Sequence, residues 1–311
     1  MYPSVKTGST LSRRISRDWK QNKWKYLLIL PVLVYLFLFC YKPMYGLVIA
    51  FKNYRPTRGI EGSRWVGVQW FEVFFRDPYC WRLIRNTFIL SGLTILFGFP
   101  APIILALLLN EIPYPRFKRT VQTITYMPYF ISLVVMCSLI KIYCQQDGIF
   151  SDIAVLMGGQ RRNLLVDPSM FRTIYVLSDI WQGIGWNSII YLAALSGIDS
   201  SQYEAAKIDG ANRFQQIIHV TLPGLAPTIV ILFILRMGGI LNVGYEKILL
   251  LYSPSTYEVA DVLSTYVYRM GIESSKYSLS TAVGLFNTLV NVFFLIVTNL
   301  ICRKATGSGL F

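Results

Sequence analysis

The sequence has few of the residues with which soluble enzymes bind metals, nucleotides and reactive groups. It contains one histidine in 311 residues, and charged residues make up only 15% of the chain. It has no Gly-x-x-x-x-Gly-Lys-[Ser/Thr] stretch, so it cannot hold nucleotide phosphates by that route. No His-Glu-x-x-His motif, Ser/His/Asp set or carboxylate pair stands at a plausible site. We therefore expect no catalytic residue, no metal ligand and no bound cofactor on this chain.

Cysteine is also scarce, and its five copies form no recognisable framework. Cys40, Cys80, Cys137, Cys144 and Cys302 include no Cys-x-x-Cys pair and no regular spacing. This pattern suits neither a disulfide scaffold nor a metal site. One pairing stays open, because Cys80 and Cys144 could both lie on the outer side of a membrane and meet there.

Apolar residues, in contrast, are abundant. The chain is 54% hydrophobic and 15% aromatic, and its mean hydropathy is +0.46. These values exclude a soluble domain and place most of the chain in a bilayer. The net charge of +14 would suit nucleic acid, but the basic residues stand at the ends of apolar runs and form no compact basic domain. We expect membrane lipid, and not nucleic acid, as the surroundings.

Residues 1–25 form a basic segment before the first apolar run. Trp19 and Trp24 stand at its end, where aromatic rings anchor a helix at the level of the lipid headgroups. We expect an interfacial helix on the cytoplasmic leaflet, with the N-terminus inside the cell. The apolar run that follows is too long for a cleavable signal. The basic residues are Lys6, Arg13, Arg14, Arg17, Lys20, Lys23 and Lys25.

Residues 26–304 contain repeated apolar runs, each near the length of about 20 residues that a helix needs to cross a bilayer. We expect an all-α integral membrane domain of six transmembrane helices, followed by a cytoplasmic tail at 305–311. The expected spans are Tyr26–Phe51, Thr87–Asn110, Thr120–Tyr143, Arg172–Leu195, Leu225–Tyr245 and Ser278–Cys302.

With the N-terminus inside, this number of spans also places the C-terminus inside. The short inner segments at 111–119 and 198–223 carry lysine and arginine, the residues that the positive-inside rule counts. Taken together, the long outer loops at 52–86, 144–171 and 246–277 are net basic as well, but long loops are exempt from the rule. The expected topology is therefore N-in/C-in.

The polar stretch at 198–223 carries helix signals that a simple turn would not need. Ser201 followed by Glu204 fits a capping box, which predicts a helix over Gln202–Asp209. Gly210 fits a helix end that needs a positive φ. We expect a second loop helix, Asn212–Leu222, that stops at the following proline.

This stretch resembles the coupling loop of ABC importer permeases, and more narrowly that of the carbohydrate-uptake branch. The resemblance is closest to the polysaccharide/lipoprotein-type sugar permeases, and it implies a type I importer fold in a bacterial cytoplasmic membrane. It also implies that the coupling residues receive a push from a partner ATPase. These residues are Tyr203, Glu204, Ala205, Ala206, Asp209 and Gly210, before Leu222-Pro223.

The resemblance implies several partners. A second permease of similar fold would complete the pathway, and a homodimer of cytoplasmic ATPase subunits would bind ATP and Mg. An extracellular lipoprotein-type solute-binding protein would deliver the solute. An ABC permease for another solute class and a secondary transporter are the alternatives. The second of these would need an inverted repeat, which the sequence does not show.

Polar residues inside two expected spans point to a solute pathway. An arginine at the centre of a span costs about 2.5–3.5 kcal/mol on insertion scales, so Arg236 should face the protein interior or a wet cavity. Asp179 lies at a similar depth in the preceding span. Either the two charges pair and hold the helices in register, or they line a polar chamber for a solute.

The family resemblance favours the chamber and implies which residues line it. Rings that stack on sugar faces and amides that bond hydroxyls fit a sugar, and the branch that the chain resembles implies an oligosaccharide. An unpaired Arg236 and the basic outer loops would favour an acidic, uronate-containing sugar, although the same outer charge could dock an acidic binding protein or lie on anionic lipid. The implied residues are Tyr129, Ser132, Asp179, Gln182, Gly183, Trp186, Arg236, Gly239 and Ile240.

Overall fold

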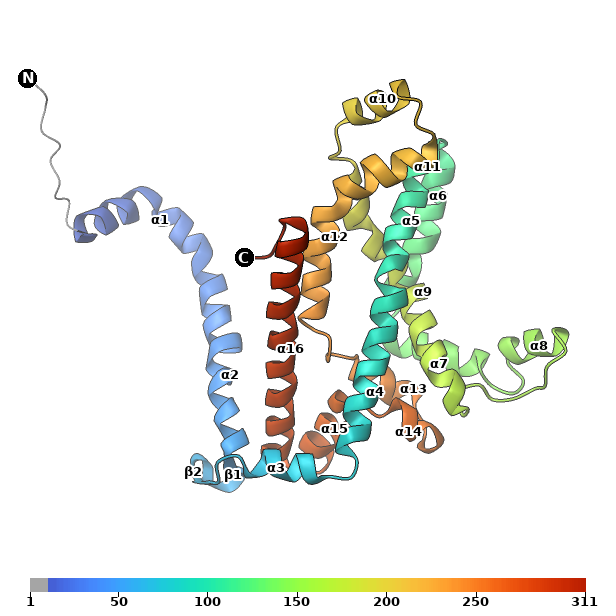
Figure 1. Ribbon diagram of the computed structural model, residues 1–311. Coiled ribbons are helices and arrows are strands. Elements are labelled where there is room, and N and C mark those ends of the chain that lie inside the picture. Colours follow the sequence, from blue (N-terminus) through green and yellow to red (C-terminus); the bar gives the residue numbers. More distant parts are fainter. Residues whose placement is uncertain (1–10) are drawn as a thin grey trace, which may run out of the picture.

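The structure is a computed structural model that describes the backbone of residues 11–311 and the side chains of residue 19 and of residues 21–311. Residues 1–10 of the expected interfacial segment lie outside the described residues. Figure 1 shows long helices arranged roughly side by side, with helices α10 and α11 at one end and a small hairpin at the other.

In chain order the elements are α1 (Leu11–Tyr35), η1 (Leu36–Tyr41), α2 (Lys42–Met44), η2 (Tyr45–Phe51), β1 (Lys52–Arg55), η3 (Pro56–Arg58), β2 (Gly59–Trp65), α3 (Gln69–Arg76), α4 (Cys80–Leu93), η4 (Thr94–Gly98), α5 (Pro100–Glu111), α6 (Pro115–Tyr126), η5 (Met127–Phe130), α7 (Leu133–Tyr143), α8 (Ile149–Leu156), α9 (Pro168–Leu195), α10 (Ser200–Ile208), α11 (Arg213–Gln216), η6 (Ile217–Thr221), α12 (Leu222–Met237), α13 (Tyr245–Leu251), η7 (Pro254–Thr256), α14 (Tyr257–Ala260), α15 (Leu263–Tyr268), η8 (Arg269–Glu273) and α16 (Tyr277–Thr306).

Among the described residues, four helices are long and apolar enough to cross a membrane, and a bent pair raises this number to five. They are Gln21–Phe51, Cys80–Glu111, Arg213–Met237, Tyr277–Thr306 and the pair Pro115–Phe130 with Leu133–Tyr143. Helix α9, the expected fourth span, has 28 residues but carries polar side chains and is not among them. The fold is therefore a mostly helical membrane fold, and the count of six and the N-in/C-in orientation stay predictions.

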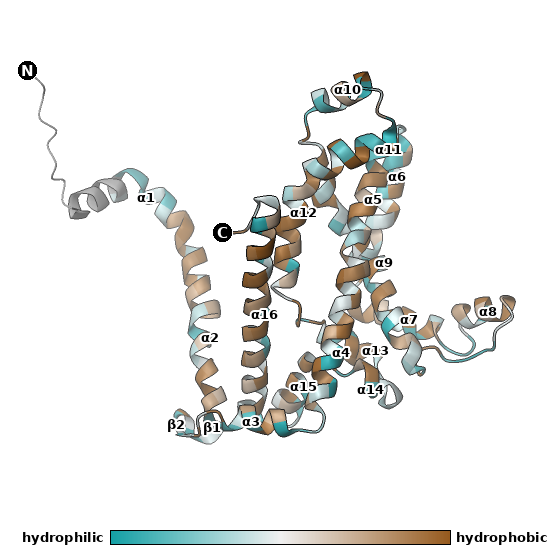
Figure 2. Ribbon diagram, viewed as in Figure 1, coloured by the Kyte–Doolittle hydropathy of each residue, from teal (hydrophilic) through white to brown (hydrophobic). Residues whose placement is uncertain are grey.

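The first span stands apart from the other helices. None of the most apolar window of Gln21–Phe51 is buried, and its main contact is made by η2 against α16. Helix α1 bends at Asn22, near the expected boundary at residue 25. Figure 2 shows apolar residues along the whole length of the span below this bend. A span that buries so little within its own chain needs lipid or another protein around it.

The third span is not the continuous helix that the sequence predicted. Helices α6 and η5 end near Phe130, and α7 continues at an angle of 99°. Pro128 lies in the last turn before this break, where it removes a backbone donor. Ser132 then starts α7 by accepting a hydrogen bond from the backbone N–H of Val135 at 3.4 Å. The break separates the two halves of the predicted span.

The fifth span is also shorter than predicted, because α12 ends at Met237 and not at Tyr245. Residues 238–244 are irregular, and polar groups of α16 hold them. Asn291 donates from Nδ2 to Asn242 Oδ1 at 3.0 Å and accepts from the backbone N–H of Leu241 at 2.9 Å. Two adjacent glycines, Gly238 and Gly239, begin this segment and do not favour helix continuation.

The first outer loop departs from the all-α expectation. Strands β1 and β2 pair antiparallel, and Ser278 of α16 holds the hairpin at Lys52 O (2.7 Å) and at Tyr54 N–H (2.9 Å). Helix α3, which precedes the second span, lies across the end of α16 (Figure 1). The all-α prediction did not include the hairpin.

Helix α9 lies at the centre of the packing. Gly185 permits a close approach to α6, because a Cβ atom there would overlap the backbone carbonyl of Thr125. Two buried clusters, one around α7, α9 and α13 and one around α3, α4, α15 and α16, flank the middle of the protein. Cys144 belongs to the first and Cys80 to the second, and both are free thiols, so they do not pair.

Candidate functional site

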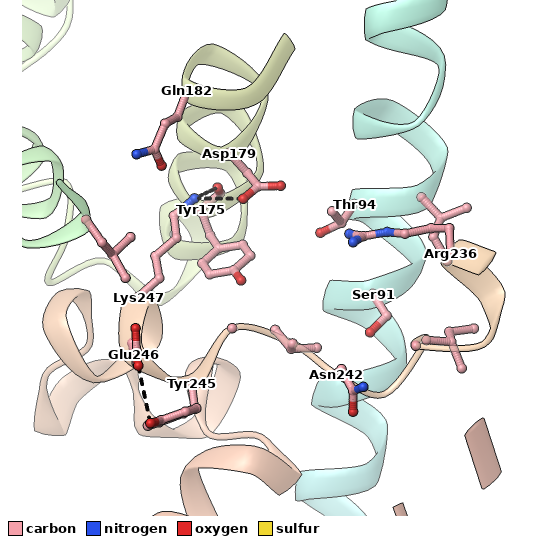
Figure 3. A pocket seen from close by; sticks show the side chains of 16 residues that line it. Ser91, Thr94, Tyr175, Asp179, Gln182, Arg236, Asn242, Tyr245, Glu246 and Lys247 are labelled. Atoms are coloured by element: carbon pink, nitrogen blue, oxygen red, sulfur yellow. Dashed lines mark hydrogen bonds and ion pairs between the residues drawn. The ribbon is translucent and has the colours of Figure 1, made fainter. Parts of the chain in front are cut away.

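A polar cavity of about 370 Å³ lies between α4, α9, the irregular end of α12 and α13 (Figure 3). It forms where α12 unwinds, because the backbone there turns away from the helix axis and leaves room between the helices. The lining residues are Ser91, Thr94, Ile95, Leu133, Tyr175, Asp179, Gln182, Arg236, Gly239, Ile240, Asn242, Val243, Gly244, Tyr245, Glu246 and Lys247.

Five of the residues that the sequence analysis named for a solute pathway line this cavity. They come from α9 and from the end of α12, two segments that are distant in the chain, and they are Asp179, Gln182, Arg236, Gly239 and Ile240. The other four named residues, Tyr129, Ser132, Gly183 and Trp186, do not line it.

Of the two alternatives that the sequence left open for Asp179 and Arg236, the ion pair does not form in the described part of the chain. Asp179 Oδ1 instead lies 3.4 Å from the Nζ of Lys247, a residue of α13. Lys247 was not predicted, because nothing in the sequence brings the segment that contains it against α9. The apolar run Ile248–Leu251 that follows it was the one available signal that this segment packs in the protein.

Lys247 is buried and held from several sides. Its side chain is 5% exposed, and its Nζ donates to the backbone carbonyl of Tyr175 at 3.0 Å. The same Nζ lies 4.4 Å from the centre of the Tyr175 ring. A buried ammonium needs such partners, since an unpaired charge in this environment is costly.

Arg236 has no such partners. Within the part of the chain that the structure describes, its guanidinium makes no ion pair and no hydrogen bond, and the residue is exposed. Figure 3 shows the side chain extending from α12 into the cavity beside Thr94. The cavity therefore presents one free cation with several hydrogen-bond donors.

Two further polar groups of the lining also differ in whether they have a hydrogen-bond partner. The hydroxyl of Ser91 is buried and has no hydrogen-bond partner among the described residues. Glu246 accepts a hydrogen bond from the hydroxyl of Tyr245 at 3.3 Å and turns toward that residue (Figure 3). Ser91 can thus donate to a solute hydroxyl.

An aromatic stack lies beside the cavity. The rings of Tyr129 and Trp186 are parallel within 5°, with centroids 4.7 Å apart, and Phe130 meets Trp186 edge-on at 5.7 Å. Trp186 lies about one helical turn along α9 from Gln182. Gln182 donates to the carbonyl of Ile131 at 3.1 Å and so joins α9 to the break in the third span.

Ser132 and Gly183 have local structural tasks in this region. Ser132 caps α7, as described above. Gly183 faces the side chain of Asn187, whose Nδ2 would lie 3.1 Å from an added Cβ atom. Neither side-chain position reaches the cavity.

The coupling stretch folds as a short helix, α10, but its cap differs from the prediction. Asp199, and not the Ser201–Glu204 pair, caps the helix by accepting from the backbone N–H of Ser201 at 2.9 Å. Hydrogen bonds from Ser201 hold the pKa of the Asp199 carboxyl below its usual range. Gly210 has φ +78°, so the prediction of a positive φ at this helix end is confirmed.

The second loop helix does not stop at Pro223. Helices α11, η6 and α12 run on without a break, and Pro223 follows directly after the π-helical turn η6, where the hydrogen-bond pattern of the helix changes. The capping box of this loop lies at Asn212 and Gln215. The loop and the fifth span are therefore one connected helical element.

Helix α10 projects from the end of the protein and is mostly exposed (Figure 1). The hydroxyl of Tyr203 lies 3.1 Å from that of Thr221, which joins α10 to η6. Glu204 and Ala205 are exposed and Ala206 is half-buried. Two large apolar side chains nearby, Ile208 at 86% and Phe214 at 69%, are exposed as well, and the sequence analysis had not singled them out.

No group of three His, Cys, Asp or Glu side chains could hold a metal ion among the described residues. The arrangement is thus a polar cavity between membrane helices, with the exposed loop helix α10 at some distance from it. It fits a transport protein.

Comparisons with known proteins identify the family. The family described as "Binding-protein-dependent transport system inner membrane component" matches residues 98–307. The chain is 44% identical to Protein LplB of Bacillus subtilis (strain 168), over 94% of this chain and 92% of LplB. It is 42% identical to the polygalacturonan/rhamnogalacturonan transport system permease protein YteP of the same strain, over 94% of this chain and 91% of YteP.

A solved structure of a bacterial ABC transporter involved in the import of the acidic polysaccharide alginate contains a similar chain. The TM-score is 0.87 at 41% identity, and the match covers 94% of this chain and 99% of that one. A bacterial alginate ABC transporter in complex with an alginate pentasaccharide-bound periplasmic protein gives a TM-score of 0.88 at 41% identity, over 96% and 100%.

The chain is therefore a transport protein of the cytoplasmic membrane that crosses it several times. It belongs to the inner membrane components of binding-protein-dependent transport systems, with the type I permease fold. The predicted membership among ABC importer permeases, and the resemblance to polysaccharide-type sugar permeases, are confirmed.

Proposed function

We propose that this chain is the transmembrane subunit of an ATP-driven importer that carries acidic, uronate-containing oligosaccharides. The observation that carries the proposal is the unpaired Arg236 in a polar cavity. A guanidinium binds a carboxylate through two parallel hydrogen bonds, which a neutral sugar cannot offer. The names of YteP and of the solved alginate transporter, which refer to acidic polysaccharides, support this choice of substrate.

The remaining lining suits the neutral part of a sugar. Gln182 and Asn242 carry amides, and Ser91 carries a free hydroxyl that can donate to a sugar oxygen. The stack of Tyr129 and Trp186 offers flat apolar faces one turn further along α9, and such faces pack on the C–H side of a sugar ring. Gly183 and Ser132 contribute to this wall only through the local contacts described above.

Energy comes from separate subunits in this proposal. A homodimer of ATPase subunits, which binds ATP and Mg, receives α10 in a surface groove. Glu204 bonds a basic partner residue there, and the small Ala205 and Ala206 allow close contact. Because α11, η6 and α12 are continuous, a push on this loop moves the end of α12 that carries Arg236. Tyr203, Asp209 and Gly210 keep the loop in shape.

A second permease of similar fold completes the pathway. The bare first span supports this partner, because a helix with no buried apolar window within its own chain has a face available for another protein. With α9 counted as a span, the chain has six and an N-in/C-in topology. The outer segments would then receive an extracellular lipoprotein-type binding protein that delivers the solute.

The test uses the complete importer in proteoliposomes, with its binding protein, and compares uptake of an oligogalacturonate with that of a neutral oligosaccharide of equal length. We expect Arg236→Gln to lower uptake of the acidic sugar by roughly tenfold, equivalent to the loss of about 1.4 kcal/mol of binding. Arg236→Lys, which keeps the charge, is the matched control and should retain more uptake. Undiminished uptake in Arg236→Gln would contradict the acidic substrate, and transport without any ATPase subunit would contradict the importer.

A further inference from the structure

The cavity contains two carboxylates and two cations, but only one of the four is free. Asp179 is held by Lys247, and Glu246 is held by Tyr245. Arg236 faces the same cavity with no ion pair or hydrogen bond in the described part of the chain. The formal charges of the lining nearly cancel. Arg236 can therefore bind an acidic solute only if the two carboxylates are held away from it.

Asp179 is the carboxylate with the means to occupy Arg236. Both side chains line one cavity, and the Asp179 side chain is 45% exposed on the cavity side. An arginine and a carboxylate attract each other, and the planar guanidinium favours a bidentate pair. Glu246, in contrast, turns toward Tyr245 and away from the α12 wall (Figure 3).

Lys247 is placed to prevent that pairing. It is fixed by burial, by the carbonyl of Tyr175 and by the Tyr175 ring, so its ammonium cannot follow Asp179 into the cavity. Its attraction therefore keeps the Asp179 carboxylate on the α9 wall. The pair joins α9 to α13, two elements that are far apart in the chain.

We propose that Lys247 is a positioning residue for substrate selection: it holds Asp179 and thereby leaves Arg236 free to bind the carboxylate of the solute. This inference rests on the proposed function, since it assumes that Arg236 binds an acidic sugar. Without Lys247, Asp179 pairs with Arg236 and competes with the solute. The cavity then accepts an acidic sugar less well, although no residue that contacts the sugar has changed.

A purely structural ion pair makes a different prediction, and the two single substitutions distinguish them. If the pair only holds α9 to α13, then removing either partner leaves the other charge buried or stranded, and both variants lose function together. If Lys247 acts through Asp179, only the loss of Lys247 exposes Arg236 to competition. Loss of Asp179 leaves Arg236 free, so Lys247→Met should reduce acidic uptake much more than Asp179→Asn does.

The experiment measures acidic and neutral oligosaccharide uptake by the complete importer, normalised to the amount of assembled complex. We expect Lys247→Met to lower acidic uptake by about tenfold, mainly through a higher apparent KM, whereas Asp179→Asn lowers it by no more than about twofold. The double variant Lys247→Met/Asp179→Asn should recover most of the loss. Lys247→Arg, which keeps the cation, should stay near the wild type.

A second comparison tests the route through Arg236. If Lys247 acts on Arg236, adding Arg236→Gln to Lys247→Met should lower acidic uptake little further, because the interaction is already lost. Equal losses in Lys247→Met and Asp179→Asn, with no recovery in the double variant, would overturn the inference. If Arg236→Gln also loses acidic uptake in that case, only the inference about Lys247 is overturned and the proposed acidic substrate stands. If Arg236→Gln loses no uptake, the acidic substrate itself is overturned, and the inference about Lys247 with it.

Discussion

Trp186 of α9 and Tyr129 of η5 lie face to face at 4.7 Å, just beyond the break that divides the third span. The stack is 41–44% exposed in this chain, which is unusual for two large rings in contact between helices. Because it lies one turn from Gln182, it extends the polar cavity with a flat apolar surface. This arrangement leads to the first prediction.

Trp186→Ala should reduce oligosaccharide uptake by roughly tenfold, since aromatic contacts of this kind are worth about 0.5–1.5 kcal/mol beyond burial. Trp186→Phe keeps an apolar ring and should retain most uptake. Trp181→Ala, on the same helix but outside the cavity and the stack, is the matched control. Equal uptake by Trp186→Ala and the wild type would exclude the stack from the pathway.

Gly185 should be intolerant of any side chain. A Cβ atom there overlaps the carbonyl of Thr125, so Gly185→Ala pushes α9 away from α6 and should lower the melting temperature of the purified permease by several degrees. Gly92→Ala, in α4, has open space around the added atom and should leave the melting temperature unchanged or raise it. Equal melting temperatures for the two variants would contradict the close contact.

The Asp261–Arg269 pair should be the more important of two contrasting ion pairs for stability. Asp261 is 3% exposed and accepts two hydrogen bonds from Arg269, at 2.7 and 2.6 Å, and one from Thr265. Asp261→Ala leaves the arginine without its carboxylate partner, which should cost about 3–5 kcal/mol. The measurement is the thermal unfolding of the purified permease, which should show this loss of stability as a lower melting temperature.

An exposed pair provides the control for that prediction. Arg76 and Glu72 lie 4.0 Å apart with side chains 84% and 60% exposed. Glu72→Ala should change stability by less than about 1 kcal/mol, because water screens such pairs. A similar loss in both variants would show that burial does not decide the cost.

The cap of α10 should depend on an oxygen acceptor at residue 199. Asp199→Ala should increase amide exchange of α10 at neutral pH, whereas Asp199→Asn, which also caps well, should leave it near the wild-type value. Because the pKa of Asp199 lies below its usual range, the cap contributes above the unfolded pKa and is lost as the pH falls through the folded pKa. No change in exchange with Asp199→Ala would exclude this cap.

Coupling should be separable from membrane insertion. Two variants test this: Glu204→Ala, and Gly210→Val at a position where the native φ is +78°. Both should keep the protein in the membrane and preserve ATP hydrolysis, while uptake falls by roughly tenfold or more. The Gln202→Ala variant, also exposed on α10, tests whether the loss is specific to Glu204. Unchanged uptake in both coupling variants would contradict the proposed role of the loop.

The sequence made the family and much of the layout predictable. Length of apolar runs and helix-ending signals are local properties, so the spans near Gln21–Phe51, Cys80–Glu111 and Tyr277–Thr306 and the turn at Gly210 could be predicted. The bounds were less accurate where a proline was involved. Pro128 lies at the end of a helix, whereas Pro223 lies at the start of α12. The presence of a proline alone does not indicate which of these two positions it takes.

Partners of charged groups were not predictable. The sequence suggested only Arg236 as a possible partner of Asp179, because these two charges lie at similar depth in consecutive spans, whereas the observed partner is Lys247. Only the packing of α13 against α9 decides that Lys247 is the partner. The unwinding of α12 after Met237 is also a tertiary outcome, because Asn291 of α16 stabilises the irregular backbone by donating to Asn242 Oδ1 and accepting from the backbone N–H of Leu241.

By itself, the sequence determined that this protein lies in a membrane, belongs to the importer permeases and carries a loop helix that ends at Gly210, since hydropathy, helix-ending signals and glycine conformations depend on neighbours along the chain. Only the tertiary structure decided which charges meet, where a helix breaks and which cation stays free, since these depend on which distant segments pack together. The free Arg236 and the held Asp179 are the clearest instance of that difference.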